Sequence, residues 1–214
     1  MVLNDVWRTI GREVGFFYEA NFSEVPGGPG VYAWFYPLRL LSREPDALDI
    51  LVQDAQTLLN YDSGGLGAQE GAGRIPFTWW SLDVNAKRVP KPFECSGSLK
   101  SSWEAVRSND SNFETLQKAL LKATIFMPPL YVGKANSLAT RCQQHIQGSG
   151  ESTFHGRFGD FAQKRKLSRR RVEELVFVCV RTGSSAVEAE VKPAVHELIE
   201  SVMKAVCGPP YGLR

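Results

Sequence analysis

The stretch Val31-Tyr32-Ala33-Trp34-Phe35-Tyr36 joins β-branched and aromatic residues, follows Pro26-Gly27-Gly28-Pro29-Gly30, and ends at Pro37. This composition between residues that break helices predicts a β-strand. Residues 130–133 predict a second strand, and residues 174–180 are apolar enough for a central, buried one. We therefore predict an α/β (α+β) fold, in which helices flank a small, mainly antiparallel central sheet built from these three strands.

Apolar residues recur at helical spacing in several segments that lie around and between the predicted strands. The predicted helices cover residues 2–22, 38–61, 112–126 and 136–146, with a long last helix from Ser184 to Gly208. Two segments predict loops: residues 64–73, which are rich in glycine, and residues 148–159. Residues 75–84 predict a short strand, and residues 89–102 are rich in Pro and Ser. Residues 38–128 thus form a large, mostly helical insertion between the first two strands of one domain, 1–214.

The composition is that of an ordinary globular protein, with 214 residues, 43% hydrophobic and 22% charged. The chain shows neither an apolar run long enough for a membrane span nor a signal peptide at its start, which predicts a cytoplasmic (intracellular) protein without a membrane partner. The four cysteines form no C-x-x-C pair, so we expect reduced, mostly buried thiols rather than a zinc knuckle.

The net charge is only +2, but basic residues are concentrated in one place. Six of the eight residues from 164 to 171 are basic: Lys164, Arg165, Lys166, Arg169, Arg170 and Arg171. A run this dense can neutralise several phosphates of a nucleic acid. The alternative interpretation is a solvated loop or helix end.

Four short motifs follow one another in an informative order: Gly30-Val31-Tyr32, Tyr131-Val132-Gly133-Lys134, Leu138-x-x-Arg141-x-x-x-His145, and a late glutamate. Together they resemble the GIY-YIG nuclease superfamily, most closely its compact restriction-type endonucleases, over the whole chain. The resemblance implies a phosphodiester hydrolase that acts on DNA. Cutting both strands at a short site would further require a homodimer.

The resemblance also implies a role for each matched residue. Tyr32 would take a proton from the attacking water, for which nearby cations must lower its pKa. Tyr131 would orient water or phosphate, and Arg141 would offer a planar fork of donors to the phosphate oxygens. His145, one helical turn beyond Arg141, would relay the proton; the alternative is a partly exposed histidine with a backbone partner.

The metal ligand implied by the resemblance is Glu190, at the end of Ser185-Ala186-Val187-Glu188-Ala189-Glu190, with Glu188 as the second candidate. A helix turns by about 100° per residue, so the two carboxylates cannot both point into one site. One carboxylate completed by waters and a phosphate oxygen suits Mg²⁺ (or Mn²⁺), which implies a one-metal mechanism.

Further DNA contacts are expected from Lys134, just after the second tyrosine, and from His155 and Arg157 in the predicted loop 154–159. The alternative for this loop is a surface turn anchored by its two phenylalanines. The chain departs from the family pattern in the long separation of Tyr32 from Tyr131 and in having no asparagine after the late glutamate. A structure-specific repair or recombination nuclease and a non-catalytic nucleic-acid-binding module therefore remain alternative functions.

Overall fold

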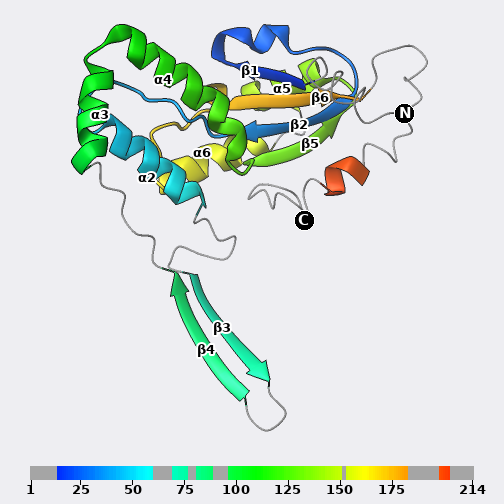
Figure 1. Cartoon of the computed structure of the whole chain (residues 1–214). Helices are drawn as coiled ribbons and strands as arrows, with labels where there is room; N and C mark the ends of the chain where they lie inside the picture. Colours follow the sequence, from blue (N-terminus) through cyan, green and yellow to red (C-terminus); the bar gives the residue numbers. More distant parts are fainter. Residues whose placement is uncertain are drawn as a thin grey trace, which may run out of the picture.

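The computed structural model describes residues 14–59, 69–76, 81–88, 96–150, 153–182 and 198–202. At its centre is a four-stranded antiparallel sheet with the strand order β1-β6-β2-β5 (Figure 1). The strands are β1 (Val14–Tyr18), β2 (Gly30–Phe35), β5 (Tyr131–Ala135) and β6 (Val176–Arg181). The predicted α+β class and the three predicted strands are confirmed, and β1 adds a fourth strand at one edge.

The helix predicted for residues 2–22 is wrong over its described part. Residues Val14–Tyr18 form β1, and the 3₁₀ helix η1 (Glu19–Glu24) follows directly. The reason is tertiary: β1 pairs along its whole length with β6, from Val14 opposite Val180 to Tyr18 opposite Val176. Pairing with a neighbouring strand outweighs the helical spacing of a glycine-containing, aromatic segment. Residues 1–13 lie outside the described residues.

Helices α5 (Leu138–Gln147) and α6 (Phe154–Lys164) pack against the sheet and build the main hydrophobic core with it. Trp34 of β2, Phe177 of β6 and Phe154 of α6 are completely or almost completely buried there. The loop predicted for residues 148–159 is wrong from Phe154 onward. Phe154, Phe158 and Phe161 recur at helical spacing on one buried face, and this burial outweighs the two glycines between them.

The predicted insertion, residues 38–128, runs between the neighbouring strands β2 and β5. Its elements are α2 (Ala47–Leu59), β3 (Gln69–Pro76), β4 (Ser81–Arg88), α3 (Gly97–Arg107), α4 (Asp110–Ala123) and the 3₁₀ helix η2 (Thr124–Phe126). A second hydrophobic cluster, built around Leu51, Trp103 and Phe113, joins α2, α3 and α4. Helix α3 begins in the Pro- and Ser-rich stretch and continues beyond it to Trp103, which is the one buried residue of the helix.

Strands β3 and β4 form a separate antiparallel hairpin that extends away from the rest of the molecule (Figure 1). Instead of a glycine-rich loop and one short strand, this region thus holds two paired strands; residues 60–68 and 77–80 lie outside the described residues.

No helix in the described ranges combines the length and apolar character needed to cross a membrane. Cys142 and Cys179 are free and buried, as predicted, and the other two cysteines fall outside these ranges.

Candidate functional site

Tyr32 and Tyr131, far apart in the sequence, lie side by side on the sheet. The register between β2 and β5 sets Tyr32 opposite Gly133 and Trp34 opposite Tyr131. Directly opposed residues share one face of a sheet, so both phenols project from the same face. Their ring centroids are 6.0 Å apart, and both side chains are buried. Antiparallel pairing therefore gathers the two tyrosines that the sequence singled out.

Gly133 is what lets the Tyr32 phenol cross over β5. A Cβ atom at this position would lie 2.5 Å from the Tyr32 hydroxyl oxygen, much closer than a real Cβ can approach. Any side chain at 133 would therefore displace that hydroxyl. The glycine of the Tyr131-Val132-Gly133 motif is thus needed for the position of the other tyrosine.

Helix α5 brings Arg141 and His145 to the same hydroxyl. The helix begins after Ser137, whose Oγ caps it by accepting a hydrogen bond from the Thr140 N–H at 3.3 Å. Arg141 Nε donates a hydrogen bond to the Tyr32 hydroxyl oxygen at 3.3 Å, and His145 Nε2 lies 2.7 Å from that oxygen. The structure thus brings together four of the five residues expected to be catalytic.

The protonation state of His145 sets the direction of this chain of hydrogen bonds. Burial, aided by the positive charges of Arg141 and Arg157, lowers the pKa of His145 to about 3. The imidazole is therefore neutral at neutral pH, and in the tautomer that carries its proton on Nδ1, its Nε2 accepts the Tyr32 O–H. In this tautomer, Arg141 donates a hydrogen bond to Tyr32, and Tyr32 donates one to His145.

The pKa of Tyr32 moves in the opposite direction to the one expected. Burial raises it well above the usual value for tyrosine, Tyr131 raises it further, and the hydrogen bond from Arg141 only partly opposes them. Arg141 does lower this pKa, but by less than burial raises it, so the condition that nearby cations bring the pKa below its ordinary value is not met among the described residues. Tyr32 remains a phenol at neutral pH, so it can accept a proton only while it passes its own proton to His145.

Arg141 is a fixed positive charge at this site. Burial opposes its charged form, but the hydrogen bond to Tyr32 and the two phenols together raise the pKa of Arg141 above its ordinary value. Its Nη1 donates to Gln144 Oε1 at 3.1 Å, which orients the guanidinium. Gln144 was not predicted, although its helical spacing of three residues from Arg141 was a usable signal.

The metal ligand is not placed by the described residues, because Glu188 and Glu190 both lie outside them. Within the described part of the chain, no three His, Cys, Asp or Glu side chains are grouped to hold a metal ion. The cluster itself offers phenols and a neutral imidazole, whereas Mg²⁺ requires oxygen ligands that include a carboxylate. These residues alone therefore do not fit Mg²⁺, and Glu190 stays a prediction.

The three expected DNA contacts outside the basic run occupy different surroundings. Lys134 is exposed on β5, but the alternation of the strand places it on the face opposite that of Tyr131. It therefore lies apart from the tyrosines. His155 and Arg157 are half-buried on α6 rather than in a loop, and His155 Nδ1 lies 3.3 Å from the His145 carbonyl oxygen. Arg157 is near enough to lower the pKa of His145.

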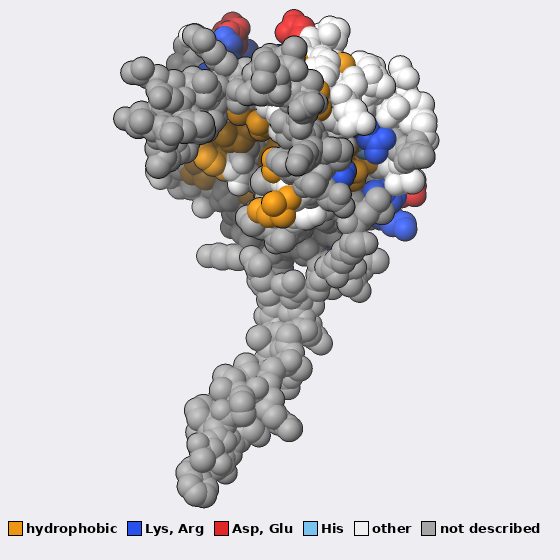
Figure 2. All heavy atoms as spheres, turned by 90° about the vertical axis from the view of Figure 1, so that its right-hand side faces the viewer, with side chains coloured by type: hydrophobic (Ala, Val, Ile, Leu, Met, Phe, Trp, Pro, Cys, Tyr) orange, Lys and Arg blue, Asp and Glu red, His pale blue; other side chains and the backbone are white. Residues whose placement is uncertain are grey.

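The basic run begins at the last residue of α6 and continues into the following loop. Four of its members are exposed: Lys164, Lys166, Arg170 and Arg171. Arg165 is half-buried, with its guanidinium 5.8 Å from the ring centroid of Phe161. Arg169 is only 4% exposed, so it does not lie on the open surface with the exposed members of the run. On the face shown in Figure 2, described basic side chains lie in small separate groups.

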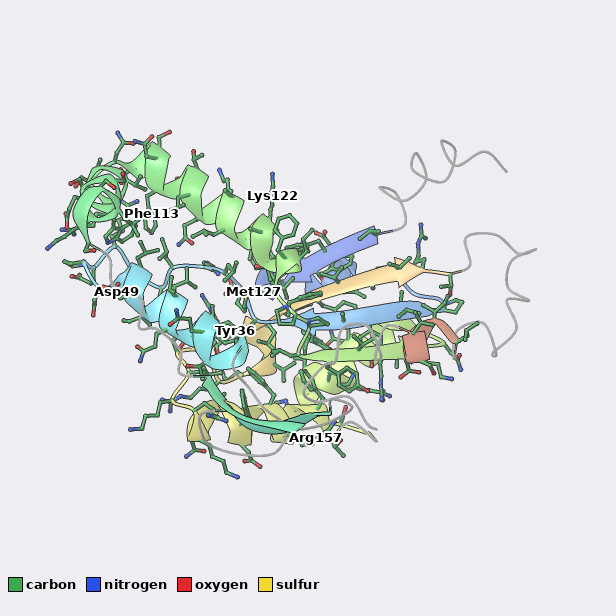
Figure 3. All side chains as sticks on the ribbon, turned by 60° about the horizontal axis from the view of Figure 1, so that its bottom comes forward. Tyr36, Asp49, Phe113, Lys122, Met127 and Arg157 are labelled. Carbon is green, nitrogen blue, oxygen red and sulfur yellow. The ribbon has the colours of Figure 1, made fainter. Side chains whose placement is uncertain are left out.

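A second polar cluster, which the sequence did not suggest, surrounds Tyr36 at the other end of β2. Its hydroxyl donates to Asp54 Oδ2 at 2.5 Å, and the same oxygen accepts hydrogen bonds from the Ser168 N–H at 3.1 Å and from the Ser168 hydroxyl. Figure 3 shows Tyr36 beside α2, well away from Arg157 on α6. The cluster therefore ties α2 to the sheet and to the loop after α6.

Comparisons of this chain with models of protein families, with curated proteins and with solved structures found no match.

Proposed function

We propose that this protein is a Mg²⁺-dependent (or Mn²⁺-dependent) endonuclease that hydrolyses phosphodiester bonds of DNA, as a site-specific restriction-type enzyme does. The observation that carries this proposal is the hydrogen-bonded chain from Arg141 through Tyr32 to His145, beside Tyr131. These four residues come from two strands and one helix, in the order on which the resemblance to the GIY-YIG nucleases rests.

Arg141 is suited to bind the scissile phosphate. Its guanidinium is half-buried and permanently charged, and Tyr32 and Gln144 hold it in one orientation. A planar fork of donors matches two non-bridging oxygens, whose negative charge grows in the transition state. Donors oriented in advance need no rearrangement when that charge develops.

Tyr32 and His145 are suited to move the proton of the attacking water. As the water oxygen forms its bond to phosphorus, one of its protons passes to the Tyr32 oxygen while Tyr32 gives its own proton to His145 Nε2. The bond from phosphorus to the leaving oxygen breaks, a solvent water gives that oxygen a proton, and His145 afterwards releases its proton to the hydroxide left in the solvent. This relay avoids a free phenolate, which burial makes unfavourable. Burial and the two arginines also disfavour the charged form of His145, so the relay requires the negative charge of the bound phosphate to stabilise the imidazolium.

The remaining component is the metal, for which Glu190 would be the protein ligand. When bound, Mg²⁺ would neutralise charge on the phosphate and on the leaving oxygen. The exposed members of the basic run would contact the DNA backbone, and a homodimer would place two such sites on the two strands.

The test is incubation of the purified protein with plasmid DNA and Mg²⁺, with a chelator added to a parallel sample. Discrete linear products that depend on Mg²⁺ support the proposal. Arg141→Ala should reduce the cleavage rate by about 10²- to 10³-fold. Glu190→Ala should abolish cutting, whereas Glu188→Ala, a matched control two residues away, should cut within a few-fold of the natural protein.

Two other outcomes would redirect the assignment. Cleavage of flaps, nicks or junctions without discrete products from plain duplex would indicate a structure-specific repair or recombination nuclease. Binding of DNA without Mg²⁺-dependent cutting of any duplex or branched substrate would indicate a non-catalytic nucleic-acid-binding module and would overturn the proposed activity.

A further inference from the structure

A small hollow lies where β2 ends, next to the start of α2 and the loop after α6. Its polar lining comes from Tyr36, Arg39, Ser42, Ser168 and Arg169. The hollow has a volume of about 20 Å³ and opens to solvent past Leu41 and Ile50, both of which are exposed. That volume admits about one water-sized group. Two of its described lining residues are arginines, and none is acidic.

Arg169 is the unusual member of this lining. It is only 4% exposed, and no ion pair with a carboxylate forms among the described residues. Its Nη2 donates a hydrogen bond to the Arg39 carbonyl oxygen at 3.1 Å. Among the described residues, this oxygen is the one acceptor of the Arg169 guanidinium. A buried charge without a counter-charge is strongly destabilising, and a guanidinium has five N–H donors to satisfy.

The nearby acidic groups are already engaged by other donors. Asp54 accepts three hydrogen bonds at one oxygen, from the Tyr36 hydroxyl and from the backbone and side chain of Ser168. Arg39 pairs with Glu19 at 2.7 Å on the surface. Glu174 accepts hydrogen bonds from the backbone N–H groups of Arg170 and Arg171. None of these three carboxylates therefore forms a direct ion pair with Arg169, although the charges of Glu174 and Glu19 favour its charged form from a distance.

Ser42 supplies a second donor at the mouth of the hollow. Its Oγ accepts a hydrogen bond from the Glu44 N–H at 3.2 Å, so the hydroxyl proton can be donated to another acceptor. Ser42 is exposed, and Arg169 lies deep, so together they line the hollow from its mouth to its interior. A cationic fork and a hydroxyl donor form a typical environment for an oxyanion.

We propose that this hollow binds a phosphate-type oxyanion, with one oxygen inside it on Arg169 and another oxygen on Ser42. The anion supplies the direct ion-pair partner that Arg169 lacks among the described residues. Its source is either inorganic phosphate or a phosphate group of a nucleic acid, because both present the same oxygen atoms. The site is separate from the Tyr32 cluster, so it does not depend on the proposed nuclease activity.

The test is thermal unfolding of the whole protein in inorganic phosphate, without metal or DNA, against sodium chloride of equal ionic strength. Phosphate should raise the unfolding temperature more than chloride does, because an anion that binds only the folded state stabilises it. Arg169→Lys keeps the charge but loses the fork and should weaken phosphate affinity about tenfold or more. Ser42→Ala, an exposed change that should not disturb folding, should weaken it by about threefold to tenfold.

Arg43→Gln is the matched control. Arg43 belongs to the same loop but pairs with Asp110 and lies over the Phe113 ring, so its loss should leave the phosphate effect unchanged. An equal effect of phosphate and chloride on the natural protein, or a phosphate effect that is unaltered in both site variants, would overturn the proposal.

Addition of a short DNA duplex in the presence of a chelator then identifies the source of the anion. If the duplex reduces the stabilisation that phosphate produces, the two compete for the hollow, and its ligand is a phosphate group of a nucleic acid. Independent, additive stabilisation supports the site with free phosphate as its ligand. The plasmid assay is separate from these measurements. If the protein does not cut plasmid DNA, that result contradicts the proposed nuclease function and leaves the proposed phosphate site unaffected.

Discussion

Two tyrosines of one strand segment, Tyr32 and Tyr36, are buried to the same extent, at 2% exposure, yet their hydroxyls meet opposite kinds of partner. The Tyr32 hydroxyl accepts a hydrogen bond from the Arg141 guanidinium and lies 2.7 Å from Nε2 of a neutral His145. Tyr36 donates to the carboxylate of Asp54. The first cluster is therefore cationic, and the second contains its own anion.

This difference in charge explains what each cluster can do. Burial is the largest cause that raises the pKa of both tyrosines, so neither hydroxyl ionises at neutral pH. The Asp54 carboxylate is already occupied by three donors from two parts of the chain, Tyr36 and Ser168, which holds α2 in place. The half-buried Arg141 instead leaves its cluster with a net positive charge that can attract a phosphate. Burial of a tyrosine thus does not define its role, whereas the charge of its partner does.

The largest expected effect comes from removing each hydroxyl in turn. Tyr32→Phe should lower the cleavage rate by about 10²- to 10⁴-fold, because the proton relay is lost, while folding changes little. Tyr36→Phe should retain the rate within a few-fold but lower the free energy of unfolding by about 1–3 kcal/mol. Single-turnover cleavage and urea unfolding of both variants measure the two effects. Equal loss of activity in the two variants would remove the distinction between the clusters.

Asp54→Ala tests the Tyr36 cluster more directly. It leaves the buried Tyr36 hydroxyl without its carboxylate acceptor and removes the acceptor of both donors of the exposed Ser168, which should lower the free energy of unfolding by about 2–3 kcal/mol. Asp110→Ala is the control, because it removes a highly exposed carboxylate from a surface pair with Arg43 and should cost less than about 1 kcal/mol. Similar losses in the two variants would show that the Asp54 hydrogen bonds do not stabilise the fold.

The pH dependence of stability tests the Tyr32 cluster. The pKa of His145 falls from 6.5 to about 3 on folding, so between these values the unfolded chain binds a proton that the folded protein does not. Stability is therefore complete above the higher value and declines as pH falls through this window, by about 2 kcal/mol at about pH 5. His145→Gln should have a shallower pH dependence of its urea midpoint over that range. An unchanged slope would place the pKa of His145 near its ordinary value.

The Tyr32 cluster and the Tyr36 cluster also differ in how much of each could be predicted from the sequence. Tyr32, Tyr131, Arg141 and His145 belong to short motifs, and Arg141 and His145 follow one helical spacing. Antiparallel pairing of two predicted strands was enough to expect them near one another. The Tyr36 cluster joins residues 36, 54 and 168, which share no motif or period. Only tertiary packing brings them together, so their residue types gave no signal.

The same distinction accounts for the other errors. In the sequence, Arg169 is one more member of a basic run. Its burial depends on tertiary packing, which the local charge pattern does not reveal. Strand β1 was hidden by apolar residues at helical spacing, since its pairing partner β6 lies more than 150 residues later in the chain. Helix α6, by contrast, could have been predicted from the helical spacing of Phe154, Phe158 and Phe161. The glycines between them favoured the prediction of a loop instead.

The smallest expected effect concerns the helix that carries Arg141 and His145. Ser137→Ala removes the side chain that caps α5 and should lower the free energy of unfolding by about 1 kcal/mol, whereas Ser137→Asn keeps a capping oxygen and should lose much less. Cleavage well below the unfolding temperature should stay within a few-fold in both variants, because the contacts of α5 with the sheet still position Arg141. A large loss of cleavage in Ser137→Ala alone would mean that the geometry at Tyr32 depends on the local order of α5. The Tyr32 cluster would then be held by one helix start, in contrast to the Tyr36 cluster, which is held by three remote segments.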